Sequence, residues 1–260
     1  MKRTLICPSR SDFPEDIWPI IEKSDVYDSS CSKEARVYFI DKGCGYYLKS
    51  SKSGTLSSEA ALDEYFHSLG LGPRVISYIK KDNTDWLLTE RVAGEDGTEQ
   101  KYLREPKRLA RFLGEKLRML HEIDFGGCPN QNRLSEYIAL ASENAGRGIF
   151  DNTFSTIPNL DKSTAERMLL DLKGALCADT LIHGDYCLPN IMLDDWSLSG
   201  FIDLGFAGVA DKHIDLFWGA FTLNFNLGTD EYRNCFFEAY GKDKIDPDLI
   251  RLIGIIECFA

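Results

Sequence analysis

The sequence predicts an α+β fold with two lobes, a small β-rich lobe at the N-terminus and a larger, mainly helical lobe after it. In the first ninety residues, short β-branched and aromatic runs alternate with turns, whereas most of the remaining chain has apolar residues at helical spacing. A chain of 260 residues with 43% hydrophobic content can form one large domain or two modest ones. A plausible hinge at Val92-Ala93-Gly94 divides the predicted lobes into residues 1–92 and 93–260.

The small lobe is predicted to contain four strands and one helix. Residues 35–40 and 45–50 flank a turn-rich stretch, which is a hairpin pattern. Leu62, Tyr65, Phe66 and Leu69 then recur at the spacing of one helix face, and the helix ends at a Gly- and Pro-rich segment. Two further strand-like runs surround the turn at 82–85. The predicted order is therefore strand, strand, helix, strand, strand.

The large lobe is predicted to be mostly helical. An amphipathic helix runs through Leu109 and ends at His121. Further helices are predicted near residues 131–144, 162–177, 211–226, 229–240 and 247–258. Aromatic residues of the fourth predicted helix of this lobe are expected to pack in the core: Phe217, Trp218, Phe221 and Phe225. Short strand-like runs between 180 and 205 carry most of the unusual polar residues.

Composition excludes several classes of function. The formal charge of −11, from 41 acidic and 30 basic residues, argues against nucleic acid or an anionic membrane as partner and leaves cationic ligands possible. No run of residues approaches a membrane span, and the apolar run before Pro8 is too short for a secretory signal. The eight cysteines contain no C-x-x-C pair and are typical of reduced packing thiols. We therefore expect a cytoplasmic protein.

Three polar side chains between residues 183 and 205 indicate a chemical site. Asp185 and Asn190 are five residues apart in "HGDYCLPN", and Asp203 follows in "GFIDLG". Carboxylate and carboxamide oxygens are ligands that suit Mg²⁺. The apolar run around Asp203 makes an ionised carboxylate costly unless a cation compensates it. The sequence therefore predicts that Asn190 and Asp203 ligate magnesium.

The same spacing matches the requirements of phosphoryl transfer from ATP. In such a reaction Asp185 accepts or orients the proton of the attacking hydroxyl, as catalytic residue. Lys49, on the second predicted strand, would reach the phosphates, and Glu59, on the following helix, would hold Lys49 through an ion pair. His183 is expected to orient the loop rather than to exchange protons.

The segment "LIHGDYCLPNIMLDDWSLSGFIDLGFAGVADKHIDL" closely resembles the aminoglycoside 3′-phosphotransferases, antibiotic-resistance kinases with a protein kinase-like fold. The likeness covers most of residues 33–215, including "YYLKS" and "LLTERVAGE". The resemblance implies a bilobal protein kinase-like fold, ATP and Mg²⁺ as cofactors, and a nucleotide-binding N-terminal lobe. It also implies a C-terminal lobe that carries the catalytic and acceptor-binding residues.

By the same resemblance, Tyr47 would stack on adenine, although a cross-strand aromatic contact is an equal alternative. The backbone from Glu90 to Val92 would hydrogen-bond the adenine edge. Ser30 and Ser32 would lie over the phosphates, where serine hydroxyls and backbone N–H groups take the place of a G-x-G-x-x-G loop.

The acceptor implied by the resemblance is an aminoglycoside, a polycation that family members bind through carboxylates. The candidates for this role are Asp151, Asp161 and Glu257. Elsewhere the family's usual acids are replaced by Asn224, Phe225, Asn226 and Cys258, and Phe206 stands where Arg is common. We expect phosphorylation of the 3′-hydroxyl, conferring resistance. The alternatives are a kinase of the same fold acting on an amino alcohol or sugar, and a catalytically silent nucleotide-binding protein.

Overall fold

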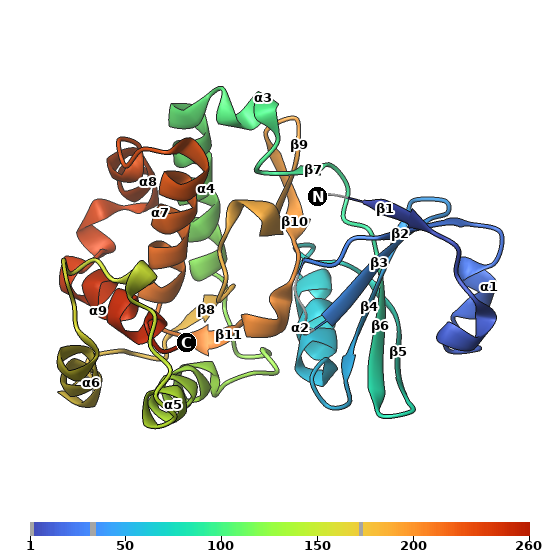
Figure 1. Cartoon of the computed structure of the whole chain (residues 1–260). Helices are drawn as coiled ribbons and strands as arrows, with labels where there is room; N and C mark the ends of the chain where they lie inside the picture. The colour runs from blue at the N-terminus through green and yellow to red at the C-terminus, as the bar shows by residue number, and fades with distance from the viewer. Residues whose placement is uncertain (1–2, 32–34, 172–173) are drawn as a thin grey trace. The chain divides into compact units, whose positions relative to one another are not determined.

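The computed structural model describes the chain apart from residues 1–2, 32–34 and 172–173 (Figure 1). The chain divides into two compact units. Unit 1 is Met1–Gly94 with Ser199–Gly205, and unit 2 is Glu95–Leu198 with Phe206–Ala260.

Unit 1 is built on an antiparallel sheet. Among the described residues the sheet has six strands in the order β1-β2-β3-β4-β6-β5. The strands are β1 (Thr4–Ile6), β2 (Asp25–Asp28), β3 (Ala35–Asp41), β4 (Tyr46–Lys52), β5 (Val75–Lys81) and β6 (Thr84–Glu90). Two helices accompany the sheet, α1 (Trp18–Ile21) and α2 (Ser57–Ser68) (Figure 1).

The two faces of this sheet are covered differently. Side chains alternate between faces along each strand, so Leu48 and Lys49 point to opposite sides. Leu48 is fully buried in a core that also contains Ile17, next to α1. The opposite face carries Lys49, and there Leu87 packs against Leu56 and Ala60 beside and within α2. This packing holds α2 on the face of the sheet that bears Lys49.

The predicted pairs of strands and the helix between them match β3, β4, α2, β5 and β6. The sequence did not predict β1, β2 or α1, because strands of three and four residues and one helical turn give little periodicity. Ser199–Gly205 belongs to unit 1, whereas the predicted boundary assigned these residues to the large lobe. The backbone N–H of Phe201 donates to the carbonyl of Leu71 over 2.7 Å, which ties this segment to unit 1.

Unit 2 is mainly helical (Figure 1). Its described helices are α3 (Gln100–Leu103), α4 (Pro106–His121), α5 (Arg133–Gly146), α6 (Lys162–Asp171), α7 (His213–Leu227), α8 (Arg233–Tyr240) and α9 (Pro247–Glu257). Short strands carry the polar loops: β7 (Glu95–Asp96) pairs with β9 (Ile191–Asp194), and β8 (Thr180–Ile182) pairs with β11 (Gly208–Ala210), both antiparallel. The strand β10 (Ser197–Phe201) continues from unit 2 into unit 1.

The core of unit 2 lies where α5, α6, α7 and α9 meet. Phe217 is buried there, as predicted. Phe225 is 74% exposed, so the prediction that it packs in the core was wrong. The reason is its place in the last turn of α7, which ends at Leu227 with a left-handed Gly228. In the described part of the chain, no helix combines the length and the apolar character needed to cross a membrane.

Candidate active site

Three charged side chains meet in unit 1. The ammonium of Lys49, on β4, lies 2.8 Å from both carboxylate oxygens of Glu59 and 2.8 Å from Oδ1 of Asp203. Glu59 lies in the first turn of α2, and Asp203 follows β10. The sheet, the helix and the end of β10 thus bring together three residues that are ten and 144 positions apart in sequence. The ion pair between Lys49 and Glu59 is the one expected from the sequence.

The charges of this group keep Lys49 protonated. Burial acts to lower the pKa of Lys49, but the carboxylates of Glu59 and Asp203 outweigh it and raise the pKa above its usual value. The Glu59 side chain is only 9% exposed, so a second charge is needed beside it. Lys49 therefore remains a cation at neutral pH.

Asp203 has a different setting from the one predicted. It lies after β10 rather than within a strand, and its side chain is 51% exposed. The cation that the structure provides for it is Lys49. The backbone of Asp203 is left-handed, with φ of 61°, a conformation that aspartate tolerates better than most residues. Lys49 thus provides the compensating cation that the sequence led us to expect, and magnesium at this carboxylate stays a prediction.

Asp185 and Asn190 are joined by hydrogen bonds in unit 2. The Asn190 amide nitrogen donates to the carbonyl oxygen of Asp185 over 3.0 Å and to its Oδ2 over 2.8 Å. Asn190 ends a short 3₁₀ turn and is buried, whereas Asp185 is half-buried. The amide therefore fixes one oxygen of the Asp185 carboxylate in a single direction.

Asp215 anchors the loop of Asp185 through backbone hydrogen bonds. It is fully buried in the first turn of α7, and its two oxygens accept from the backbone N–H groups of His183 and Gly184, both over 2.7 Å. His121, at the end of α4, also contacts Asp215 over 3.1 Å, and Tyr240 contacts the other ring nitrogen of His121. The sequence analysis assigned no role to Asp215, although an acidic residue inside the apolar run of α7 was a signal that it has one.

The backbone of the loop requires glycine at one position. Gly184 has φ of 84°, and a Cβ there would lie 1.9 Å from the carbonyl oxygen of Phe206. His183 is fully buried, and its Nδ1 accepts from the N–H of Asp185 over 3.2 Å. His183 thus takes part in the internal bonding of the loop.

The residues expected to bind adenine lie in unit 1. Tyr47 is on the sheet face that bears Lys49, and its ring centroid is 5.2 Å from that of Phe39. Glu90 ends β6, where its carboxylate pairs with Arg74 and its N–H donates to the Arg74 carbonyl over 2.9 Å. Val92 follows β6 and is half-buried. Tyr47 therefore makes the cross-strand aromatic contact, on the same sheet face as Lys49.

The serines expected over the phosphates are described only in part. Ser30 uses its hydroxyl oxygen to accept from the N–H of Val37 over 3.0 Å, and its own N–H donates to Asp28 over 2.9 Å. Its hydroxyl oxygen thus closes the loop after β2. Ser32 lies outside the described residues.

The three predicted acceptor acids have different surroundings. Asp151 and Asp161 are exposed and accept from nearby threonine and serine groups, which lower the pKa of both carboxyls. Glu257 is buried and accepts from Tyr137 over 2.7 Å and from Trp218 over 3.0 Å. Burial raises the pKa of Glu257 to about 7, and the charge of Asp185 contributes to that rise. Glu257 and Asp185 are thus close enough to interact electrostatically.

The predicted magnesium ligands have suitable donor chemistry. Across the described residues, no group of three or more His, Cys, Asp or Glu side chains forms a metal site by itself. Asn190 binds Asp185 through its amide nitrogen, so its amide oxygen is the atom suited to a cation. Asp203 offers a half-exposed carboxylate. Such oxygen donors fit Mg²⁺, which takes its remaining ligands from phosphate and water.

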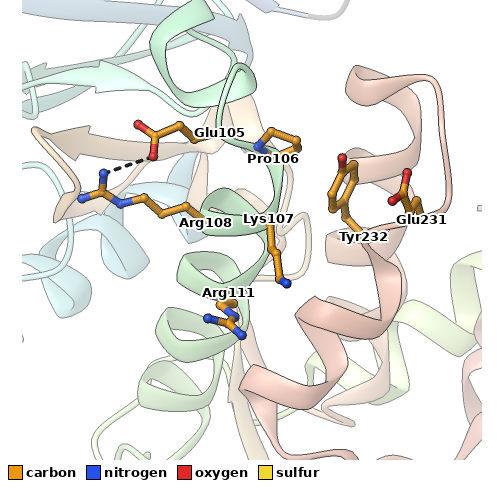
Figure 2. Close-up of a pocket in the computed structure, with 7 residues that line it drawn as sticks. All are labelled: Glu105, Pro106, Lys107, Arg108, Arg111, Glu231 and Tyr232. Carbon is orange, nitrogen blue, oxygen red and sulfur yellow. Dashed lines mark hydrogen bonds and ion pairs between the residues drawn. The ribbon is translucent and has the colours of Figure 1, made fainter.

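A separate open pocket of about 600 Å³ lies beside the start of α4 (Figure 2). Its lining is Glu105, Pro106, Lys107, Arg108, Arg111, Glu231 and Tyr232, and Glu105 and Arg108 form an ion pair. None of the residues that line this pocket belongs to the predicted site. Its mixed charge gives no reason to place a cationic acceptor there.

Comparison with known proteins shows the family of this chain. Residues 32–253 match the model of the phosphotransferase enzyme family. The chain belongs to this family. The matched part of this phosphotransferase includes Lys49, Asp185 and Asp203, whereas Ser30 and Glu257 lie outside it.

Two curated relatives of the phosphotransferase carry aminoglycoside names. A probable aminoglycoside 3′-phosphotransferase of Lactococcus lactis is 47% identical over 251 residues, which is 95% of each chain. An aminoglycoside 3′-phosphotransferase of Niallia circulans is 33% identical over 182 residues, 69% of each chain. These matches confirm the resemblance seen in the sequence.

Solved structures confirm the predicted fold. An aminoglycoside phosphotransferase of Streptomyces rimosus superimposes with a TM-score of 0.74 at 25% identity, covering 86% of this chain and 89% of that one. A type VIII aminoglycoside 3′-phosphotransferase gives a TM-score of 0.70 at 24% identity and covers 90% of this chain and 91% of that one. The antiparallel sheet followed by a mainly helical part is therefore the aminoglycoside phosphotransferase fold.

Proposed function

We propose that this protein transfers the γ-phosphate of ATP to the 3′-hydroxyl of an aminoglycoside antibiotic and so confers resistance. The observation that supports this most is the fixed carboxylate of Asp185, which Asn190 orients and whose loop Asp215 anchors. The name of the Lactococcus lactis relative, at 47% identity, supports the same acceptor and position.

Asp185 would act on the acceptor hydroxyl. Asn190 takes up one carboxylate oxygen, which leaves the other to accept the hydroxyl proton. The hydroxyl oxygen forms a bond to the γ-phosphorus as the bond from that phosphorus to the β–γ bridging oxygen breaks, and ADP leaves. The carboxylate orients the hydroxyl and takes up the proton released on transfer.

Unit 1 would hold the nucleotide. Lys49, kept charged by Glu59, is suited to bind the phosphates of ATP. Tyr47 would stack on adenine, the backbone from Glu90 to Val92 would bond its edge, and Ser30 with Ser32 would lie over the phosphates. A Streptomyces rimosus aminoglycoside phosphotransferase has been solved with ADP and streptomycin, which agrees with a nucleotide cofactor of this kind.

Asn190 and Asp203 would hold magnesium through their side-chain oxygens. When bound, Mg²⁺ supplies positive charge that offsets the charge of the phosphates. On this assignment, Lys49 also holds the Asp203 carboxylate in place through the ion pair of 2.8 Å.

The acceptor would be bound through acidic side chains of unit 2. Glu257 interacts with Asp185 and carries a pKa of about 7, so a nearby ammonium group would favour its charged form. Asp151 and Asp161 offer ionised carboxylates further out on exposed loops. The formal charge of −11 favours approach of a polycation, and we place the reaction in the cytoplasm, where ATP is present.

The assignment of Asp185 is tested by Asp185→Ala. The variant should lose at least a hundredfold in kcat with kanamycin or neomycin as acceptor, because general acid–base groups contribute about 10²–10⁴-fold. Its affinity for ATP should stay close to that of the wild type, since unit 1 supplies the nucleotide contacts. Steady-state ATP consumption and calorimetric ATP binding measure the two quantities. A variant that keeps most of its turnover would disprove the role of Asp185.

A further inference from the structure

The sheet face that carries Lys49 carries a second cation with no role so far. The strand register places Tyr27, Phe39 and Tyr47 in one row across β2, β3 and β4. Residues two apart on a strand share a face, so Tyr47 and Lys49 lie on the same side of the sheet. Arg3, directly before β1, has its side chain on this row.

The contacts of Arg3 are specific. Its guanidinium carbon lies 3.7 Å from the ring centroid of Phe39 and 5.9 Å from that of Tyr47. Its Nη2 donates to the Tyr47 hydroxyl over 2.8 Å. This bond uses one of five N–H donors, so the guanidinium can bind a further acceptor while it rests on the rings. The aromatic row thus holds a charged fork at a defined place.

The charge balance of this face favours an anion at Arg3. Lys49 is matched by two carboxylates, so the group formed with Glu59 and Asp203 carries a formal charge of −1. Without Mg²⁺, a polyphosphate that approaches Lys49 therefore also meets two like charges. Within the part of the chain that the structure describes, Arg3 has no carboxylate partner, and its contacts are the two rings and the Tyr47 hydroxyl. Its charge remains to offset that repulsion.

We propose that Arg3 is a nucleotide-binding residue that contacts the phosphate chain of ATP. This rests on the proposed function, in which unit 1 binds ATP. The strand register supports this contact. Thr4 pairs with Asp28, so Arg3 lies beside the end of β2 that leads to Ser30, a residue proposed to lie over the phosphates. A planar guanidinium can bind two phosphate oxygens at once, which makes arginine well suited to this contact.

The test is nucleotide binding by Arg3→Met, measured by calorimetry without acceptor for adenosine, AMP, ADP and ATP. Methionine keeps the apolar contact with Phe39 and removes the charge. The Kd for ADP and ATP should rise about tenfold, the loss of one charge-assisted hydrogen bond, while the Kd for adenosine should not change. Arg3→Lys should recover part of the loss. Thermal unfolding of the variant checks that it is folded.

The matched control is Arg36→Met. Arg36 is an exposed arginine of β3 that pairs with Ser50, on the opposite face of the same sheet. The Arg36→Met variant loses the same charge from the same unit. Its Kd values for adenosine, AMP, ADP and ATP should stay close to those of the wild type. An equal loss in this control would mean that net charge, not contact, matters, and would overturn the proposal.

Two other results would also overturn it. An equal loss for adenosine and ATP would mean that Arg3 acts only by holding Tyr47. Tighter ATP binding by Arg3→Met would mean that Arg3 blocks the nucleotide. If the wild type bound no adenine nucleotide, the proposed function itself would fail. If the wild type bound ATP and Arg3→Met bound it equally well, only the role of Arg3 would fail.

Discussion

The position of a functional residue in this protein depends on hydrogen bonds from residues that are distant in sequence. Asp215 lies 32 residues after His183, yet its carboxylate accepts the N–H groups that begin the loop of Asp185. Removing a buried acceptor that satisfies two backbone donors costs about 1–3 kcal/mol for each donor left unpaired. The position of Asp185 therefore depends on a residue that a motif search would treat as packing.

The titration of Glu257 gives a prediction for the dependence of stability on pH. Its pKa is about 7 in the folded protein against an ordinary value of 4.5, so the folded state binds the proton more tightly. The unfolding free energy should then fall by on the order of 3 kcal/mol as the pH rises from about 4.5 through 7. The stabilising contribution of Glu257 is fully present at a pH below its pKa in the unfolded chain. It is lost at a pH above its pKa in the folded protein.

Urea unfolding of wild type and Glu257→Gln between pH 5 and pH 8 measures this contribution. Glutamine keeps an oxygen that can accept from Tyr137 and Trp218, but it does not titrate. The wild type should lose stability relative to the variant as the pH rises. Two curves that stay parallel across this range would show that the raised pKa is incorrect.

Individual site residues were predicted from sequence to different extents. Lys49 and Glu59 form the expected ion pair because a strand followed by a helix packed on the same sheet face fixes their order in space. The exposure of Asp203 could not be read from its apolar neighbours, because they lie in β10 and the turn after it while Asp203 itself adopts a left-handed backbone. Asp215 was missed because its partners are distant in sequence.

The helices α4 and α8 approach each other closely at Gly114. A Cβ at Gly114 would lie 2.3 Å from the carbonyl oxygen of Phe236 and 2.9 Å from the nitrogen of Tyr240, both in the backbone of α8. Backbone atoms cannot move aside as a flexible side chain does. Gly114 therefore sets the distance between two helices whose C-terminal ends carry His121 and Tyr240.

Gly114→Ala should destabilise the protein by about 1–3 kcal/mol, the usual cost of overpacking a core. The matched control is Gly146→Ala in α5, where nothing lies within 4 Å of the added Cβ. In a helix this change is neutral or stabilising by up to about 1 kcal/mol. Thermal unfolding of the two variants gives the comparison. An equally stable Gly114→Ala would show that α4 and α8 can separate without cost.

Long elements rich in apolar residues were predicted well. The helices α4, α7 and α9 match the predicted spans to within a few residues, because a long apolar stripe in α4 and long apolar segments in α7 and α9 determine them. The strands β1 and β2 were not predicted, since each is held by pairing with the next strand rather than by its own pattern. That is also why Arg3 could not be placed on the face of Lys49 from sequence.

The predicted site residues of the molecule are divided between its two units. Unit 1 contains Lys49, Glu59 and Asp203, and unit 2 contains Asp185 and Asn190. The predicted fold class could be read from the change of periodicity along the chain, because a sheet and a set of helices have different apolar spacing. The return of Ser199–Gly205 to unit 1 could not, because it depends on a hydrogen bond with Leu71.

The identity of the acceptor hydroxyl decides which reaction the protein catalyses. ATP consumption should be measured with kanamycin, with neomycin, with congeners that lack the 3′-hydroxyl, and with choline and simple sugars. We expect turnover with the first two, loss of it with the 3′-deoxy congeners, and a product that carries its phosphate on the 3′-oxygen. Turnover with the 3′-deoxy congeners would contradict the position of transfer. Turnover only with choline or a sugar would contradict the acceptor class.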